Sequence, residues 1–382
     1  MSVGWRFLSA VLLLAVSGAP LWGADIRKPN VLMLVVDEWP RGLPTDEDRA
    51  SDSIRKFMAG GVSFESAVAN SPDLKAQQAT LLTGLYPCHH GFFSGGAVAK
   101  KPAATLGTVL SGREFTCESL GAWRIPDGDS LIAGGDWGFE FPGCSDSASG
   151  AIESKDSLLV ITDQASMRLQ KYSDASMPFL LLINLQTPQA DASQNLKDIG
   201  VCIDRLMEQL QSNGLRDSTI VILTALRNSE DETTVGAQRD VSACRIPTAI
   251  QWPGRIPAGR KSSACLSTVD LLPTVCGMVG VGFPDFIDGL DLSDSTRVDC
   301  SCEPDFAFLQ RLSVDPTEQW RAVCDQRLMY LQMNAPPHAE FLLRWSLVSD
   351  RQRNLIADES RAADVRRMRQ WLMEKRLVLQ DD

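Results

Sequence analysis

Residues 30–38 read Asn-Val-Leu-Met-Leu-Val-Val-Asp-Glu, and this stretch decides the fold class. A continuous apolar run of this length is typical of a strand that is buried on both faces, as in a parallel sheet. The run ends in Asp37 and Glu38. Functional sites in open α/β sheets collect at the carboxyl ends of the strands, so these two acids are candidates for a site. A turn carboxylate without a functional role is the simpler alternative.

Two more apolar runs, over 178–185 and 219–223, predict buried strands further along the chain. The segment between them predicts a helix, because apolar residues recur at helical spacing over 202–210 and Gly214 is a suitable stop. Helix, short loop and parallel strand in this order are typical of a doubly wound sheet.

Later segments complete the predicted α/β domain. Residues 246–252 predict another strand, and 269–281 predict a helix that is interrupted near Pro273. In the last third, 328–333 and 341–347 alternate apolar and polar residues, as in a small antiparallel sheet. A final helix follows, with one apolar face formed by Val365, Met368, Trp371 and Leu372. We therefore expect an α/β domain over 25–300 and a C-terminal α+β subdomain over 301–382.

The composition is that of an ordinary globular protein, with 44% hydrophobic and 22% charged residues in 382. The formal net charge of −11 makes nucleic acids and anionic membrane surfaces poor partners. A polyanionic glycan would also be repelled, unless a local basic patch outweighs the overall field.

The first 24 residues predict a signal peptide. Arg6 precedes an apolar run over 7–16, and small residues surround a suitable cleavage point within 17–24. The run is too short for a stable membrane span, although an uncleaved anchor is an alternative. We expect a secreted or periplasmic protein.

Ten cysteines lie beyond this segment, and their even number permits disulfides in an oxidising compartment. The pairing cannot be deduced from the sequence. Cys202 and Cys276 lie in apolar stretches, which favours buried thiols.

Several segments, in order from Lys28 to the end of the chain, resemble the sulfatase family. The most specific is Thr-Leu-Leu-Thr-Gly-Leu-Tyr-Pro at 80–87, followed by His90-Gly91. The others are 28–30, 138–141, 214–221, 245–247, 252–254, 269–274, 345–347 and 354–355. The resemblance implies an alkaline-phosphatase-like fold, with a mixed sheet sandwiched by helices. It also implies a calcium ion and the hydrolysis of sulfate esters.

The family's catalytic motif is absent at the matching positions. Sulfatases oxidise the Cys of a C-x-P-x-R motif, just before the Leu-Thr-Gly segment, to a formylglycine nucleophile. Residues 74–78 here read Leu-Lys-Ala-Gln-Gln, so Leu74 replaces the Cys and Gln78 replaces the Arg. A sulfate-binding Lys becomes Ala122, and the positions of two family His residues hold Arg124 and Gln189. Leucine has no atom that could act as a nucleophile.

The family's metal site is also incomplete. Asp37 stays and its acidic neighbour becomes Glu38, while the family's later metal-binding Asp and its neighbour align with Leu226 and Arg227. Calcium requires six to eight oxygen ligands, so we predict no cofactor. Instead, Arg227 or Arg124 is expected to pair with Asp37 or Glu38 where the ion would have been.

Two functions remain open. The first is a non-catalytic protein whose cleft could still bind an anionic glycan through Lys75, Arg124 and Arg227, or which could bind another protein. The second is a divergent hydrolase of sulfuric or phosphoric esters with a rebuilt site, in which calcium could return. Its candidate groups are Asp37, Glu38, Lys75, Thr80, His89, His90 and Arg124. Four of these have a simpler interpretation, namely packing for Thr80, solvation for Lys75 and an exposed turn for the two histidines.

Overall fold

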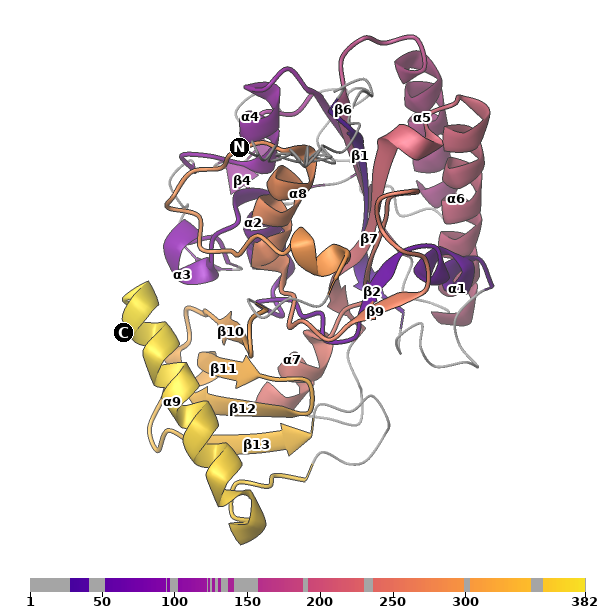
Figure 1. The fold of residues 1–382 in the computed structure, drawn as a ribbon. Coiled ribbons are helices and arrows are strands. Elements are labelled where there is room, and N and C mark those ends of the chain that lie inside the picture. The colour runs from indigo at the N-terminus through magenta and orange to yellow at the C-terminus, as the bar shows by residue number, and fades with distance from the viewer. Residues whose placement is uncertain are drawn as a thin grey trace, which may run out of the picture.

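A seven-stranded mixed sheet forms the centre of the large domain (Figure 1). The computed structural model describes residues 28–40, 52–93, 95–96, 102–121, 123, 126–127, 130–131, 137–140, 157–187, 192–229, 236–298, 303–344 and 353–381. From edge to edge the strands are β3 (Thr116–Leu120), β6 (Phe179–Leu185), β1 (Asn30–Trp39), β7 (Thr219–Asn228), β8 (Thr248–Gln251), β2 (Val62–Phe64) and β9 (Arg260–Ser262).

The first apolar run lies in the middle of this sheet, as its composition predicts. β1 is parallel to its two neighbours, β6 and β7, and β3 is parallel to β6. β8 runs antiparallel to β7 and β2, and β9 is parallel to β2. Every side chain from Val31 to Val36 is fully buried, because helices cover both faces of the sheet.

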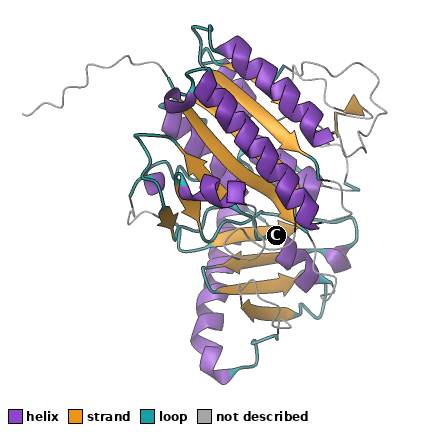
Figure 2. Cartoon of the chain, turned by 90° about the vertical axis from the view of Figure 1, so that its right-hand side faces the viewer, coloured by secondary structure: helices purple, strands orange, loops and turns teal. Residues whose placement is uncertain are grey.

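Helices on each face of the sheet form the outer two layers. On one face lie α1 (Asp52–Ala59), α5 (Ser157–Tyr172) and α6 (Ala192–Ser212), which are seen in front of the sheet in Figure 2. On the other lie α2 (Leu74–Thr83), α4 (Leu106–Ser111) and α8 (Leu271–Val279) (Figure 1). The short elements are α3 (Pro87–His90), β4 (Pro126–Asp127), β5 (Ser130–Leu131), η2 (Arg216–Ser218), α7 (Ala237–Ala243), η3 (Thr268–Asp270) and η4 (Asp294–Thr296).

The C-terminal part is a four-stranded antiparallel sheet with one long helix across it (Figure 1). Its elements are β10 (Ala307–Arg311), η5 (Pro316–Glu318), β11 (Trp320–Cys324), β12 (Leu328–Met333), β13 (Glu340–Arg344), η6 (Glu359–Arg361) and α9 (Ala362–Leu379). Val365, Met368 and Leu372 are buried against the sheet, while Trp371 is partly buried at the edge of this core. The predicted α/β fold with a small α+β part is confirmed. The predicted domain boundary falls within 299–302, outside the described residues.

Two predictions about local structure were wrong in detail. β1 continues through Trp39, so Asp37 and Glu38 lie inside the strand and not in a turn after it. Pro273 does not interrupt a helix, because it lies in the first turn of α8, where its missing N–H has no intrahelical partner to lose. The break instead separates η3 from α8 at Asp270.

None of the helices in the described part of the chain combines the length and apolar character needed to cross a membrane. Residues 1–27, which contain the predicted signal peptide, lie outside the described residues.

Candidate functional site

The acidic end of β1 meets the end of β7, and an ion pair joins the two strands. Glu38 and Arg227 occupy paired positions in the parallel register. Arg227 Nε donates to Glu38 Oε2 over 3.0 Å, and one of its terminal nitrogens donates to the same oxygen. Each side chain is only 20% exposed. Of the pairings that the sequence left open, the structure forms the one between Arg227 and Glu38.

Asp37 lies beside this pair but makes a different contact. Successive side chains of a strand point to opposite faces, so Asp37 and Glu38 do not face the same space. Asp37 is 8% exposed and accepts a hydrogen bond from Gln186 Nε2 over 3.2 Å. Gln186 follows β6, and the next residue, Thr187, donates its hydroxyl to the Glu38 carbonyl over 3.0 Å. These contacts bind the ends of β1 and β6 together.

The donors at these strand ends do not fit a calcium ion. Leu226 is fully buried and its side chain supplies no oxygen, and the Glu38 carboxylate is already paired with the Arg227 guanidinium. Calcium needs several oxygen ligands with net negative charge, whereas among the described residues at these strand ends only Asp37 adds a second carboxylate, and that carboxylate accepts from Gln186. Among the residues that the structure describes, no group of three or more His, Cys, Asp or Glu side chains could hold a metal ion.

Leu74, at the position that matches the family's nucleophile, is the first residue of α2. The Asp73 carboxylate accepts from the backbone N–H of Ala76 over 2.9 Å and caps the helix start. Leu74 and Lys75 lie in the first turn and are half-buried, whereas Gln78 is buried one turn further along the helix. The helix ends at Gly84, whose φ of 64° is left-handed, and a side chain there would collide with Ile287.

The buried amide of Gln77 is a feature that sequence reasoning missed. Its side chain is fully buried in α2, and neither its nitrogen nor its oxygen has a hydrogen-bond partner among the described residues. Neither the spacing nor the composition of 74–83 distinguishes this glutamine from its neighbour Gln78, so no sequence signal could have identified it.

His90 is buried, and the expectation of an exposed turn was wrong for it. Its Nδ1 accepts from the Phe92 backbone N–H over 3.0 Å, and its Nε2 lies 3.0 Å from the Thr80 hydroxyl. Burial lowers the pKa of His90 to about 3, so the ring is neutral. Thr80 packs in the core, as its simpler interpretation predicted. Both residues hold α2 against α3 and lie within the protein, away from solvent.

His89 points the other way and connects α3 with the C-terminal helix. Its Nδ1 lies 2.8 Å from the Asp288 carboxylate, and its Nε2 lies 2.9 Å from the Leu379 carbonyl. The hydrogen bond to Asp288 raises the pKa of His89. These contacts assign His89 to the docking of α9.

Three candidate positions lie outside the described residues, namely Ala122, Arg124 and Gln189. The described cysteines are all free thiols, and Cys202 and Cys276 are buried, as their apolar surroundings predicted. Burial raises the pKa of the Cys276 thiol to about 12, so it stays protonated.

Comparisons with known proteins show that the chain is similar to sulfatases. No protein-family model matches the chain. It is 23% identical over 336 residues to an ulvan-active sulfatase of Formosa agariphila, and 24% identical over 366 residues to the N-acetylgalactosamine-6-sulfatase of Canis lupus familiaris. These alignments cover 70% and 76% of this chain, and the chain spans 65% and 69% of the two relatives.

The structural likeness covers nearly the whole chain. A solved 2-O GAG sulfatase superposes with a TM-score of 0.75 at 17% identity, covering 93% of each chain. The sulfatase-like fold that the sequence predicted is confirmed by this likeness.

Proposed function

We propose that this relative of the sulfatases, which has their alkaline-phosphatase-like fold, is an exported protein that does not hydrolyse sulfate esters. The observation that carries the proposal is the Glu38–Arg227 ion pair at the strand ends, together with Leu74 at the start of α2. Arg227 places a cation at a position that matches a metal ligand of the sulfatases. Leu74 places a hydrocarbon side chain at the position that matches their nucleophile.

The chemistry of ester cleavage supports this proposal. A sulfate ester is an anion, so its hydrolysis requires an activated nucleophile and cationic groups around the sulfate oxygens. Leu74 supplies no nucleophile, and the neutral Gln78 replaces a guanidinium. The Arg227 guanidinium is paired with the Glu38 carboxylate, so its positive charge is less available to a substrate. His90 is neutral and buried, so it is a poor source of acid–base catalysis.

The positive role that we propose is recognition of an anionic glycan. Relatives include an ulvan-active sulfatase and an N-acetylgalactosamine-6-sulfatase. Lys75 and Arg124 would supply positive charge at the former cleft, with a smaller part from Arg227. Export by a segment at 1–24 would bring the protein to such glycans.

A hydrolysis assay tests the loss of catalysis. Purified mature protein is incubated with an aryl sulfate, an aryl phosphate and sulfated oligosaccharides, with millimolar calcium or with a chelator. We expect no release of sulfate or phosphate above that of the Asp37→Ala variant. Saturable turnover that Asp37→Ala abolishes would overturn the proposal and favour a hydrolase with a rebuilt site.

A further inference from the structure

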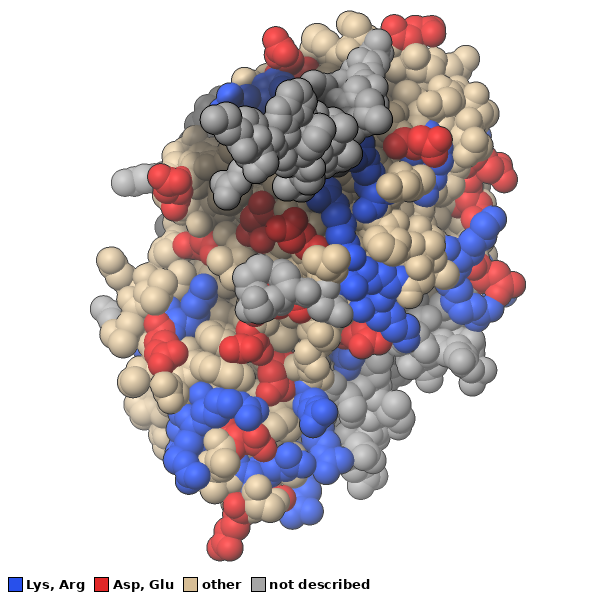
Figure 3. Space-filling model, viewed as in Figure 1, with Lys and Arg blue, Asp and Glu red and all other residues tan. Residues whose placement is uncertain are grey.

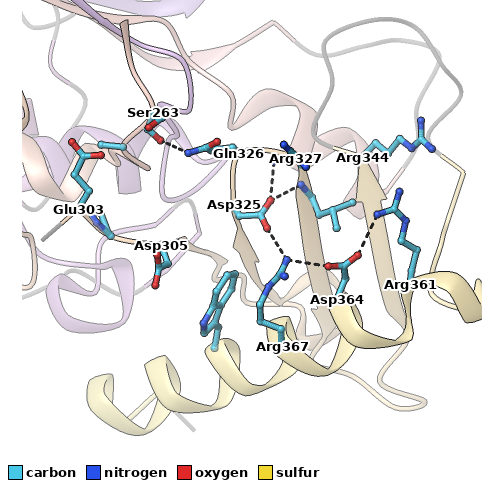
Figure 4. Close-up of a pocket in the computed structure, with 14 residues that line it drawn as sticks. Ser263, Glu303, Asp305, Asp325, Gln326, Arg327, Arg344, Arg361, Asp364 and Arg367 are labelled. Carbon is cyan, nitrogen blue, oxygen red and sulfur yellow. Dashed lines mark hydrogen bonds and ion pairs between the residues drawn. The ribbon is translucent and has the colours of Figure 1, made fainter. Parts of the chain in front are cut away.

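A polar pocket of about 930 Å³ lies in the C-terminal part of the molecule (Figure 4). Its walls come from the first half of α9, the β11–β12 turn, the end of β13, and the loops at 263–264 and 303–305. It shares no residue with the Glu38–Arg227 pair. At the other end of β10, Arg311 pairs with Asp240 of α7, so the pocket and α7 lie at opposite ends of that strand.

Charges of opposite sign are separated along this pocket. Figure 4 shows Arg327, Arg344 and Arg361 toward one end, and Glu303 and Asp305 at the other. A single ligand could therefore meet guanidinium groups at one end and carboxylates at the other.

Two of the arginines are available for a ligand. Arg327 and Arg344 are exposed, and neither makes a side-chain hydrogen bond or ion pair with any residue that the structure describes. Arg327 lies in the turn just before β12 and Arg344 ends β13, where it pairs in register with Leu328, the neighbour of Arg327. Both guanidinium groups line the pocket without a carboxylate partner among the described residues, so each offers fork-shaped donors to an anion.

The remaining charges in the pocket hold its walls in place. Arg367 bonds Asp325 over 3.0 Å and Asp364 over 3.1 Å, and Asp364 also bonds Arg361. The other Asp325 oxygen accepts the backbone N–H groups of Arg327 and Leu328, both over 2.8 Å. Asp325 therefore links the turn that carries Arg327 to Arg367 of α9.

Arg367 packs against a pair of stacked aromatic side chains. Its guanidinium lies 5.0 Å from the centre of the Trp371 ring, and Trp371 stacks on Phe306 at 4.9 Å. Trp371 therefore holds the Arg367 side chain against the pocket wall.

We propose that this pocket binds an acidic oligosaccharide. Sulfate or carboxylate groups of the ligand would bind Arg327 and Arg344, whose fork-shaped donors match their oxygens. Sugar hydroxyls would donate to the Glu303 and Asp305 carboxylates at the other end. The volume is that of a site for a ligand of a few sugar rings.

The local charge favours an anion despite the net charge of −11. α9 carries five Lys or Arg residues against two Asp or Glu, and Figure 3 shows basic side chains gathered on this part of the surface. Within the pocket, Arg361 and Arg367 are paired with Asp364 and Asp325, so the uncompensated positive charge at this end is that of Arg327 and Arg344.

Binding to matched variants tests the site by calorimetry at about 0.15 M salt. The probes are a sulfated, a carboxylated and a neutral tetrasaccharide, together with an acidic peptide of equal charge. The test variant is Arg327→Ala/Arg344→Ala. The control, Arg297→Ala/Arg366→Ala, removes the same charge from exposed arginines outside the pocket.

We expect wild type to bind an acidic tetrasaccharide and the test variant to bind it at least about tenfold more weakly. The control should stay within about twofold, and the neutral sugar should not bind. A sulfated ligand alone or a carboxylated ligand alone would identify which acid is recognised. Absence of binding to both acidic sugars, equal losses in both variants, or tighter binding of the peptide would overturn the proposal. None of these outcomes depends on whether the chain hydrolyses esters.

Discussion

At the residue scale, Arg227 and Glu38 lie 189 positions apart in the chain and meet through neighbouring strands. Removing one partner of a largely buried ion pair leaves the other charge desolvated and unpaired. We expect Arg227→Ala to lower the free energy of unfolding by about 1–3 kcal/mol, measured by urea denaturation at pH 7.

The neighbouring contacts of Arg227 make a double-mutant cycle the proper control for this pair. Glu38→Ala and the double variant should give a coupling energy of about 1 kcal/mol or more. Arg297→Ala, at an exposed arginine, should change stability by less than about 0.5 kcal/mol. An effect of Arg227→Ala within that same range would contradict the view that the pair replaces the metal as a structural element.

At the element scale, the end of α9 is fixed by a buried ion pair. Arg321 of β11 donates to the Asp381 carboxylate through two nitrogens, one of them over 2.8 Å, and the two side chains are 5% and 4% exposed. Asp381→Ala would leave the Arg321 guanidinium buried without its partner. We expect a loss of about 3 kcal/mol in the free energy of unfolding, measured by urea denaturation.

A conservative replacement separates charge from packing at this position. Asp381→Asn keeps the shape and one acceptor oxygen, so it should cost less than Asp381→Ala but more than a surface change. Equal stability of wild type and Asp381→Ala would show that α9 is held by its apolar face alone, through Met368 and Leu372.

At the scale of the whole molecule, the described residues at the strand ends do not offer the set of oxygen donors that a calcium ion needs. We therefore expect millimolar calcium, added after chelation, to leave the melting temperature of the mature protein unchanged. A bound ion at about a hundred times its dissociation constant would add about 2.7 kcal/mol, which is plainly visible in thermal unfolding. A calcium-specific rise that Asp37→Ala removes would contradict the expectation and would restore ester hydrolysis as the leading function.

Much of this architecture follows from local sequence patterns. The apolar runs at 30–36, 178–185 and 219–223 predict the three central strands, because a strand covered on both faces must be apolar throughout. The spacing of Val365, Met368 and Leu372 likewise predicts α9, since one face of that helix is buried. The predicted loss of the family's catalytic groups rests on the sequence alone, through the resemblance, and stays a prediction.

The tertiary structure decides which residues from distant parts of the sequence become neighbours. The sequence left open whether Arg227 or Arg124 would pair with Asp37 or Glu38; the register of β1 against β7 brings Arg227 to Glu38, while Arg124 lies outside the described residues. The inward turn of α3 buries His90, which a local reading places in solvent. The arginine-lined pocket needs five separate segments to meet, and no local pattern encodes that meeting. Local patterns determine which residues are buried in each element, whereas the packing of distant elements decides which charges become neighbours.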